Sequence, residues 1–175
     1  WLVLARTNPL LKPIPKILKQ KGLFFKTVDG NSIAKNLYED IEHWNKIRKG
    51  ESIPEIQEQR VLEKIKGKPN YSLEWYDAFD NIASSKIDYL RTMISNGEKI
   101  NKEPRITVST IHGAKGGEAA NVVLFLNQTT NTMKASKKSV YKQDEEYRVW
   151  YVGVTRTIQN LYLVKCNNKR KEFII

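Results

Sequence analysis

Short apolar runs bounded by turn residues occur near both ends of the chain. They have the length of buried strands, and they predict strands at Leu2–Ala5, Leu23–Val28, Ile106–Thr110, Val122–Phe125 and Leu161–Val164. Between the first two runs, apolar residues at helical spacing predict a helix over residues 10–21, which Gly22 ends. A strand, helix, strand order favours a parallel sheet, so we expect an α/β fold.

The pattern changes to helices from residue 29 to about residue 100. Apolar positions recur there every three or four residues, and they predict helices that begin after Ser32, at Pro54, near Leu73 and at Ser85. We interpret this segment as a helical insertion. The aromatic side chains near Leu73 either form its core or offer a platform for stacking bases, and their helical spacing favours the core.

Residues 126–142 are rich in Asn, Thr, Ser and Lys, which predicts an exposed loop. The lysines of this loop either touch a nucleic-acid backbone or are simply solvated. Asp144 is the expected N-cap of the next helix, which we expect to end near Arg156. Glu145 and Glu146 then fall in its first turn, where negative charge suits the helix dipole.

The amino-acid composition gives the chain a strong positive charge. Thirty Lys and Arg against nineteen Asp and Glu give a formal net charge of +11, which favours a polyanionic partner such as nucleic acid. No apolar run approaches the roughly 18 residues of a membrane span, and the start lacks the pattern of a secretory signal. We therefore expect a cytoplasmic protein without a membrane partner. One cysteine and two histidines provide no metal-ligand set of familiar spacing, so no metal site is predicted.

The segment between the third and fourth predicted strands, HGAKGGE, carries candidate chemistry. Its glycines allow a close approach of the backbone to a ligand, and Lys115 adds a positive charge, so the loop is suited to binding phosphate. A merely flexible connection would have the same composition. The spacing alone does not decide between the two.

Three separated stretches together resemble the motifs of the UvrD/Rep-like superfamily-one DNA helicases. They are WLVLARTN at the start, RITVSTIHGAKGGEAANVVLF in the middle, and DEEYRVWYVGVTRTIQNLYLV near the end, in the chain order of that family. The resemblance implies the second of two RecA-like motor domains, an α/β fold with a parallel sheet flanked by helices. It would be assembled from residues 1–28 and 101–175. Residues 29–100 would be a helical insertion, shorter than many accessory subdomains of the family.

The resemblance also implies a nucleotide site. Arg156 matches the family's arginine finger, and Arg6 matches a second sensor of the γ-phosphate. Glu118 matches the acid that contacts the ribose, and Gly116 and Lys115 belong to the same nucleotide-binding loop. Three positions depart from the family pattern. Ala5 stands where many members have an adenine-stacking tyrosine, and Gly117 and Ala119 stand where a leucine and a phenylalanine are common.

A second set of matches implies contacts with single-stranded DNA. Thr110 and His112 match positions that couple the nucleotide cleft to the DNA backbone, and Lys115 is suited to phosphates of either ligand. The implied partners are single-stranded DNA, a duplex junction, and an N-terminal RecA-like motor domain of the same polypeptide. The implied direction of movement is 3′ to 5′.

The implied cofactor is ATP with Mg²⁺. The chain has no Gly-x-x-x-x-Gly-Lys-Ser/Thr phosphate loop and no strand ending in paired acids, so we expect the metal to be held mainly by the first motor domain. We also expect this chain, which begins with Trp, to be a fragment that does not hydrolyse ATP alone. Two alternatives remain open: a nonenzymatic nucleic-acid-binding module, and a regulatory half that has lost ATP coupling.

Overall fold

The computed structural model describes residues 1–175. The chain divides into two compact units, which are described separately. The first unit comprises residues 1–17, 25–30 and 105–175, and the second comprises residues 18–24 and 31–104. The identification of these units as a motor domain and a reduced accessory subdomain stays a prediction, as do its boundaries at residues 28 and 100.

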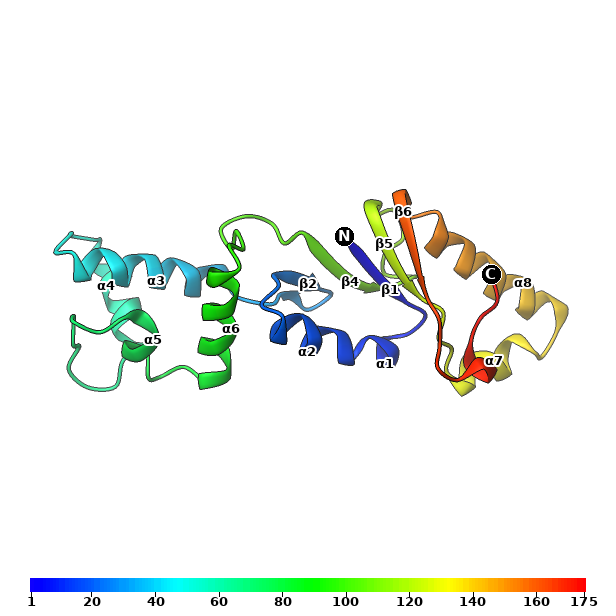
Figure 1. Ribbon diagram of the computed structural model, residues 1–175, viewed down its shortest axis with the longest axis horizontal. Helices are drawn as coiled ribbons and strands as arrows, with labels where there is room; N and C mark the ends of the chain where they lie inside the picture. Colours follow the sequence, from blue (N-terminus) through cyan, green and yellow to red (C-terminus); the bar gives the residue numbers. More distant parts are fainter. The chain divides into compact units, whose positions relative to one another are not determined.

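The first unit is built on a parallel sheet (Figure 1). The order is β2-β4-β1-β5-β6, with the two-residue strand β3 (Gly30–Asn31) beyond β2. The strands are β1 (Leu2–Ala5), β2 (Phe25–Thr27), β4 (Ile106–Thr110), β5 (Ala119–Phe125) and β6 (Thr157–Val164). The four pairings among these five strands are parallel. The α/β prediction is confirmed, and the last two strands begin earlier than the apolar runs indicated.

The helices of this unit differ from the prediction in their number and in their bounds. They are α1 (Asn8–Leu11), α2 (Pro13–Gln20), which continues into the second unit, α7 (Thr130–Ser136) and α8 (Val140–Val154). The prediction of an exposed loop over residues 126–142 was wrong. Side chains cap both helices locally, because Thr129 accepts from the Thr132 amide and Ser139 from the Lys142 amide, each at 3.2 Å. Helix α8 therefore begins at Val140, so the predictions that Asp144 is its N-cap and that Glu145 and Glu146 lie in its first turn were wrong.

The core of the first unit lies between one face of the sheet and α8. Leu4, Val122 and Leu124 are fully buried there, and Trp150 of α8 packs against them with 1% of its surface exposed. Gly153 lets α8 approach the sheet, since a Cβ at this position would lie 3.3 Å from Leu124 Cδ1. This packing fixes α8 and the side chains that it carries.

The second unit is helical. Its helices are α3 (Lys35–Arg48), α4 (Glu55–Leu62), α5 (Trp75–Ala78) and α6 (Ser84–Ser95). Trp44 and Phe79 are fully buried with their rings 5.9 Å apart, and Trp75 is 6% exposed. These three aromatic side chains therefore belong to the core of the unit.

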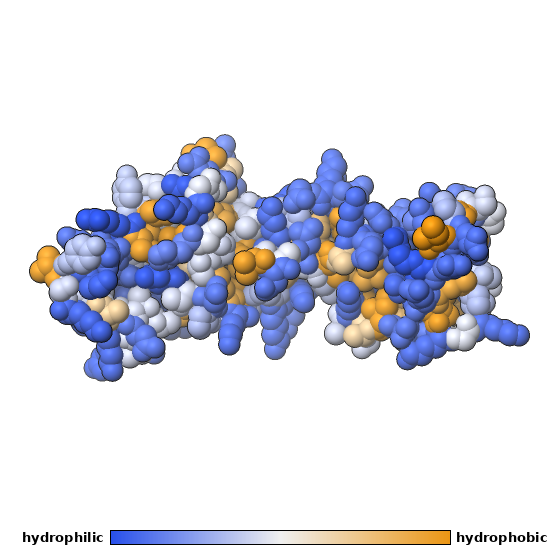
Figure 2. All heavy atoms as spheres, turned by 180° about the vertical axis from the view of Figure 1, so that it is seen from behind, coloured by the Kyte–Doolittle hydropathy of each residue, from blue (hydrophilic) through white to orange (hydrophobic).

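None of the helices has both the length and the apolar character that a membrane crossing requires. Hydrophilic residues cover most of the face drawn in Figure 2, and apolar residues form separate groups between them. The net charge is divided unequally between the units. The first holds 16 Lys and Arg against 6 Asp and Glu, a net charge of +10, whereas the second holds 14 against 13. The positive charge of the chain is therefore concentrated in the unit that contains the sheet.

Candidate functional site

The candidate residues fall at two opposite edges of the parallel sheet. We call the edge at which the strands end the carboxyl edge, and the edge at which they begin the amino edge. Arg6 and His112 follow the ends of β1 and β4, whereas Glu118 and Arg156 immediately precede β5 and β6. The loop of residues 111–118 connects the two edges, because it leaves β4 at one and enters β5 at the other.

This arrangement separates the two arginines that were expected to share one phosphate. The register pairs Leu4 with Leu124 and Ala119 with Thr157, which places Arg6 level with Leu126 and Arg156 level with Glu118. The eight strand positions between these levels span about 26 Å at roughly 3.3 Å per residue. Two extended arginine side chains do not bridge that distance to one γ-phosphate, so the predicted shared contact does not hold in this fold.

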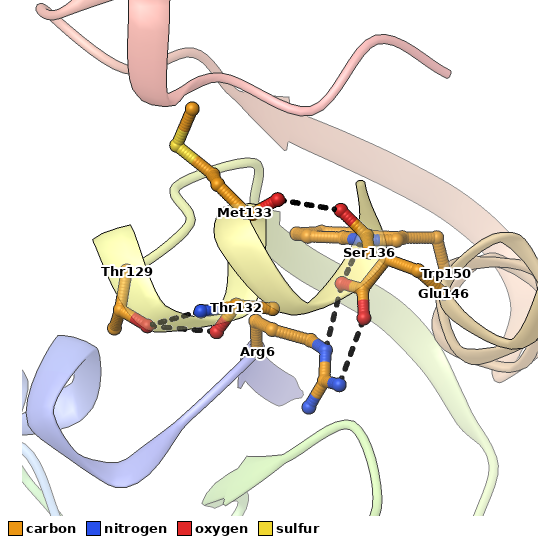
Figure 3. A network of polar contacts seen from close by, with 7 residues as sticks. All are labelled: Arg6, Thr129, Thr132, Met133, Ser136, Glu146 and Trp150. Atoms are coloured by element: carbon orange, nitrogen blue, oxygen red, sulfur yellow. Dashed lines mark hydrogen bonds and ion pairs between the residues drawn. The ribbon is translucent and has the colours of Figure 1, made fainter. Parts of the chain in front are cut away.

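At the carboxyl edge, Arg6 is held by Glu146 of α8 (Figure 3). Arg6 Nε donates to Glu146 Oε1 at 2.8 Å and Nη2 donates to Oε2 at 2.9 Å. The indole nitrogen of Trp150 donates to the same Oε1 at 2.9 Å, and Phe173 stacks on the Trp150 ring with 4.6 Å between centroids. The side chains of Arg6 and Glu146 are only 18% and 7% exposed, so the two charges neutralise each other in a mostly buried pair.

Beside this pair lies a pocket of about 680 Å³. We call it the α7–α8 pocket, because most of its lining comes from these two helices. The lining contains two carboxylates, Glu145 and Glu146, and a larger number of basic and hydroxyl side chains: Arg6, His112, Thr132, Ser136, Lys138, Lys142 and Arg148. Of the cations, Arg6 and Lys142 have carboxylate partners, whereas Lys138 and Arg148 have none within 4.0 Å. The pocket is therefore suited to an anionic ligand.

Thr110 and His112 do not line the same pocket. The Thr110 hydroxyl accepts a hydrogen bond from the Gly113 amide at 3.0 Å, which starts the turn of the loop. Thr110 faces a second pocket of about 620 Å³, which also includes Asn8 and Lys12. His112 is exposed and lines the α7–α8 pocket. Both nevertheless lie at the carboxyl edge.

At the amino edge, the structure brings Glu118 and Arg156 to neighbouring positions. The Ala119 amide donates to the Arg156 carbonyl at 3.0 Å, which joins the start of β5 to the residue before β6. The Arg156 side chain donates to the Val152 carbonyl at 3.1 Å and has no carboxylate partner. Its charge is therefore not neutralised within the chain.

Lys115 belongs to the amino-edge side of the loop. It lines a pocket of about 270 Å³ together with Gly117 and Glu118. Gly116 lies between them with φ +85, a left-handed conformation that favours glycine, and it is exposed. Lys115, Gly116 and Glu118 thus form one exposed stretch at this edge.

The side chains of the chain do not fit a bound magnesium ion. No three His, Cys, Asp or Glu side chains lie close enough together to hold a metal ion. The carboxylate of Glu118 stands alone at the amino edge, and Glu146 is occupied by Arg6. We therefore assign no Mg²⁺ ligand to the residues of this chain.

The α/β fold agrees with the comparisons with known proteins. Residues 31–168 match the family described as the UvrD-like helicase C-terminal domain, and the chain belongs to this family. One relative is the ATP-dependent DNA helicase srs2 of Schizosaccharomyces pombe, which is 29% identical over 121 residues. The match covers 67% of this chain and 13% of that protein.

Glu146 and Trp150 were missed as site residues by the sequence analysis. Glu146 was assigned only a favourable place in a helix turn. Its spacing from Trp150, four positions along the same helix, was a signal that the two side chains meet. Nothing in the sequence indicated that Arg6, 140 positions away, joins them.

Proposed function

We propose that this chain is the second motor domain of an ATP-dependent DNA helicase that translocates on single-stranded DNA and unwinds duplex. Membership of the UvrD-like helicase family supports this proposal, as does the similarity to a protein described as an ATP-dependent DNA helicase. The observation that carries it is the course of the loop of residues 111–118. This loop runs from His112 at the carboxyl edge, proposed for DNA, to Glu118 at the amino edge, proposed for ATP.

The amino edge is the proposed nucleotide side. Arg156 would act as an arginine finger, which stabilises negative charge that develops on the transferred phosphoryl group. Its guanidinium suits this role because it has no carboxylate partner in the chain. Glu118 would accept a hydrogen bond from a ribose hydroxyl, with Gly116 and Lys115 of the same loop close to the nucleotide. Arg6 lies at the other edge and is not part of this proposed nucleotide side.

The carboxyl edge is the proposed DNA side. Thr110 and His112 would contact the backbone of a single strand that crosses this edge. Arg6 would act there as a positioning residue, since its guanidinium is fixed by Glu146 beside the α7–α8 pocket. The concentration of positive charge in this unit supports a polyanionic ligand.

The connecting loop would couple the two sides. The loop packs closely against β4 at Gly113, since a Cβ at this position would lie 2.6 Å from Ser109 Oγ. Ile111 and Ala114 anchor it, because they are 1% and 7% exposed and belong to the core cluster. A displacement at His112 would therefore be transmitted toward Glu118 through a short, packed segment.

The activity requires a second protein part. A first RecA-like motor domain of the same polypeptide would supply the phosphate loop and the acids that hold Mg²⁺, and ATP would bind between the two domains. This chain alone would be inactive. Because the proposed substrate is DNA, we expect the protein to act inside the cell.

The test is ATP hydrolysis by the polypeptide that contains this chain and its first motor domain, with and without single-stranded DNA. We expect Arg156→Ala to lower the DNA-stimulated rate about 10³- to 10⁵-fold while DNA binding persists. Arg91→Ala, which removes an exposed arginine of the second unit, is the control and should leave the rate unchanged. An unaffected rate in Arg156→Ala would instead favour a nucleic-acid-binding or regulatory module.

A further inference from the structure

An exposed tyrosine flanked by lysines marks the corner between α7 and α8. Tyr141 is 63% exposed, and Lys138 and Lys142 on either side of it line the α7–α8 pocket. Both lysines are exposed as well. Basic side chains that alternate with an exposed aromatic ring are typical of surfaces that bind single-stranded nucleic acid.

The corner is held in a defined geometry. The Ser139 hydroxyl accepts from the Lys142 amide at 3.2 Å, so Tyr141 and Lys142 lie in the capped first turn of α8. The Lys142 ammonium lies 5.6 Å from the centre of the Tyr141 ring. The same ammonium pairs with Glu145 at 2.7 Å, and this hydrogen bond lowers the pKa of the Glu145 carboxyl. Glu145 therefore competes with any anionic ligand for Lys142.

A second basic segment lies at the same edge. The turn at Lys169–Lys171 consists of three exposed cations, and the Lys171 carbonyl accepts from the Gln128 amide at 2.8 Å. This bond places the turn beside the connection from β5 to α7. The positive surface at the carboxyl edge thus continues past the α7–α8 pocket.

We propose that the corner of α7 and α8 binds a single strand of nucleic acid, with a base stacked on Tyr141 and backbone phosphates held by Lys138 and Lys142. The proposal rests on the proposed function only in requiring a nucleic acid at the carboxyl edge. It adds a contact surface on α7 and α8 beyond the loop residues Thr110 and His112.

The exposed ring of Tyr141 is the reason why we propose a single strand, rather than a duplex, as the ligand of this surface. In a duplex the faces of the bases are covered by their neighbours, whereas an unpaired base presents a face to an exposed ring. Phosphate binding alone would require only the lysines and would not distinguish the two forms. The preference for unpaired bases therefore tests the role of Tyr141 separately from the role of charge.

The first experiment measures binding of this chain to a short oligothymidylate and to an abasic oligonucleotide of the same length. Tyr141→Ala should weaken binding to oligothymidylate about 5- to 150-fold, the range for loss of one base-aromatic stack. It should leave binding to the abasic strand unchanged, and Tyr141→Phe should bind both like the native chain. Equal affinity of the native chain for the two strands, or for duplex and single strand, would overturn the proposal.

The second experiment tests the lysines through salt dependence. Lys142→Gln should reduce the slope of log K against log salt by about 0.7, as expected for one lost phosphate contact on a single strand. Glu145→Gln should tighten binding, because it frees Lys142 from its partner. Lys86→Gln is the matched control, since Lys86 is also an exposed lysine in the first turn of a helix, α6. A slope that changes equally in Lys142→Gln and Lys86→Gln would contradict the proposal.

The two proposals fail in different measurements. Loss of oligothymidylate binding in Tyr141→Ala, together with unchanged hydrolysis in Arg156→Ala, would support the strand site and refute the motor. The reverse result would support the motor and refute the strand site. Neither measurement depends on the other, since oligonucleotide binding by this chain needs no ATP.

Discussion

Arg6 and Glu146 come from opposite ends of the chain and form a bidentate ion pair, with hydrogen bonds of 2.8 and 2.9 Å. The pair joins the end of β1 to α8 at the carboxyl edge of the sheet. Because both side chains are mostly buried, water compensates poorly for the loss of either charge. The proposed DNA side of the domain therefore depends on an electrostatic contact far from the proposed finger, Arg156.

The first prediction concerns the stability of this pair. Glu146→Gln removes the negative charge and leaves the Arg6 guanidinium uncompensated, so we expect a loss of about 3 kcal/mol in the free energy of unfolding. Urea denaturation of this chain measures it. Glu145→Gln is the control, because the Glu145 side chain is 41% exposed and its ion pair with Lys142 lies at the surface, so its loss should not shift the denaturation midpoint measurably. Equal midpoints in the two variants would show that the buried pair does not stabilise the fold.

A second prediction tests the close approach at Gly22 in the second unit. Gly22 has φ +61, and an added Cβ would lie 2.5 Å from Thr92 Cγ2 and 2.9 Å from the Thr92 carbonyl carbon. Gly22→Ala should therefore cost about 3 kcal/mol, from left-handed strain together with crowding. Gly50→Ala is the matched control, since Gly50 has φ +76 with nothing within 4 Å, and should cost about 1 kcal/mol. Similar losses in a denaturation experiment would show that the packing against Thr92 is loose.

The third prediction is a pH dependence from Tyr89 in the second unit. Burial raises the pKa of Tyr89 from 10.0 to about 12. Its hydroxyl donates to the Leu23 carbonyl at 2.6 Å and lies 2.8 Å from Ser32 Oγ. Since the folded pKa is above the unfolded one, the stabilisation is complete below pH 10 and is lost as the pH rises toward 12.

Tyr89→Phe checks this assignment. The variant should be less stable near neutral pH, because it loses the bond to Leu23, and its stability should fall less between pH 10 and pH 12. Denaturant midpoints across this range measure both effects. A variant with the same pH dependence as the native chain would assign the titration to another group.

Much of the fold could be anticipated from the sequence, since apolar runs locate strands wherever a sheet is buried. Ile106–Thr110 was found with its observed ends, as was Leu2–Ala5. The start of β6 was missed because this strand is largely exposed and its first residues, including Gln159 and Asn160, are polar. Helix α7 was missed because a side-chain cap, rather than an apolar stripe, accounts for its start.

Only part of the candidate site could be predicted from the sequence. Motif resemblance identified single residues such as Glu118 and Arg156, which the sheet then brings to neighbouring positions. It did not reveal that Arg6 lies at the other edge, because that follows from the direction and register of strands distant in sequence. The burial of Glu146 likewise depends on the packing of α8, which local spacing does not specify.

The central claim is that the amino edge binds the nucleotide and the carboxyl edge binds DNA. Its most direct test compares Arg156→Ala with a double variant, Arg6→Gln and Glu146→Gln, in the polypeptide with both motor domains. The two amides can bond to each other, so the double variant removes the charges without leaving one unpaired. At saturating single-stranded DNA, we predict that Arg156→Ala loses ATP hydrolysis while the double variant keeps a rate close to the native one. A double variant as inactive as Arg156→Ala at saturating DNA would contradict the account, because it would place Arg6 on the nucleotide side.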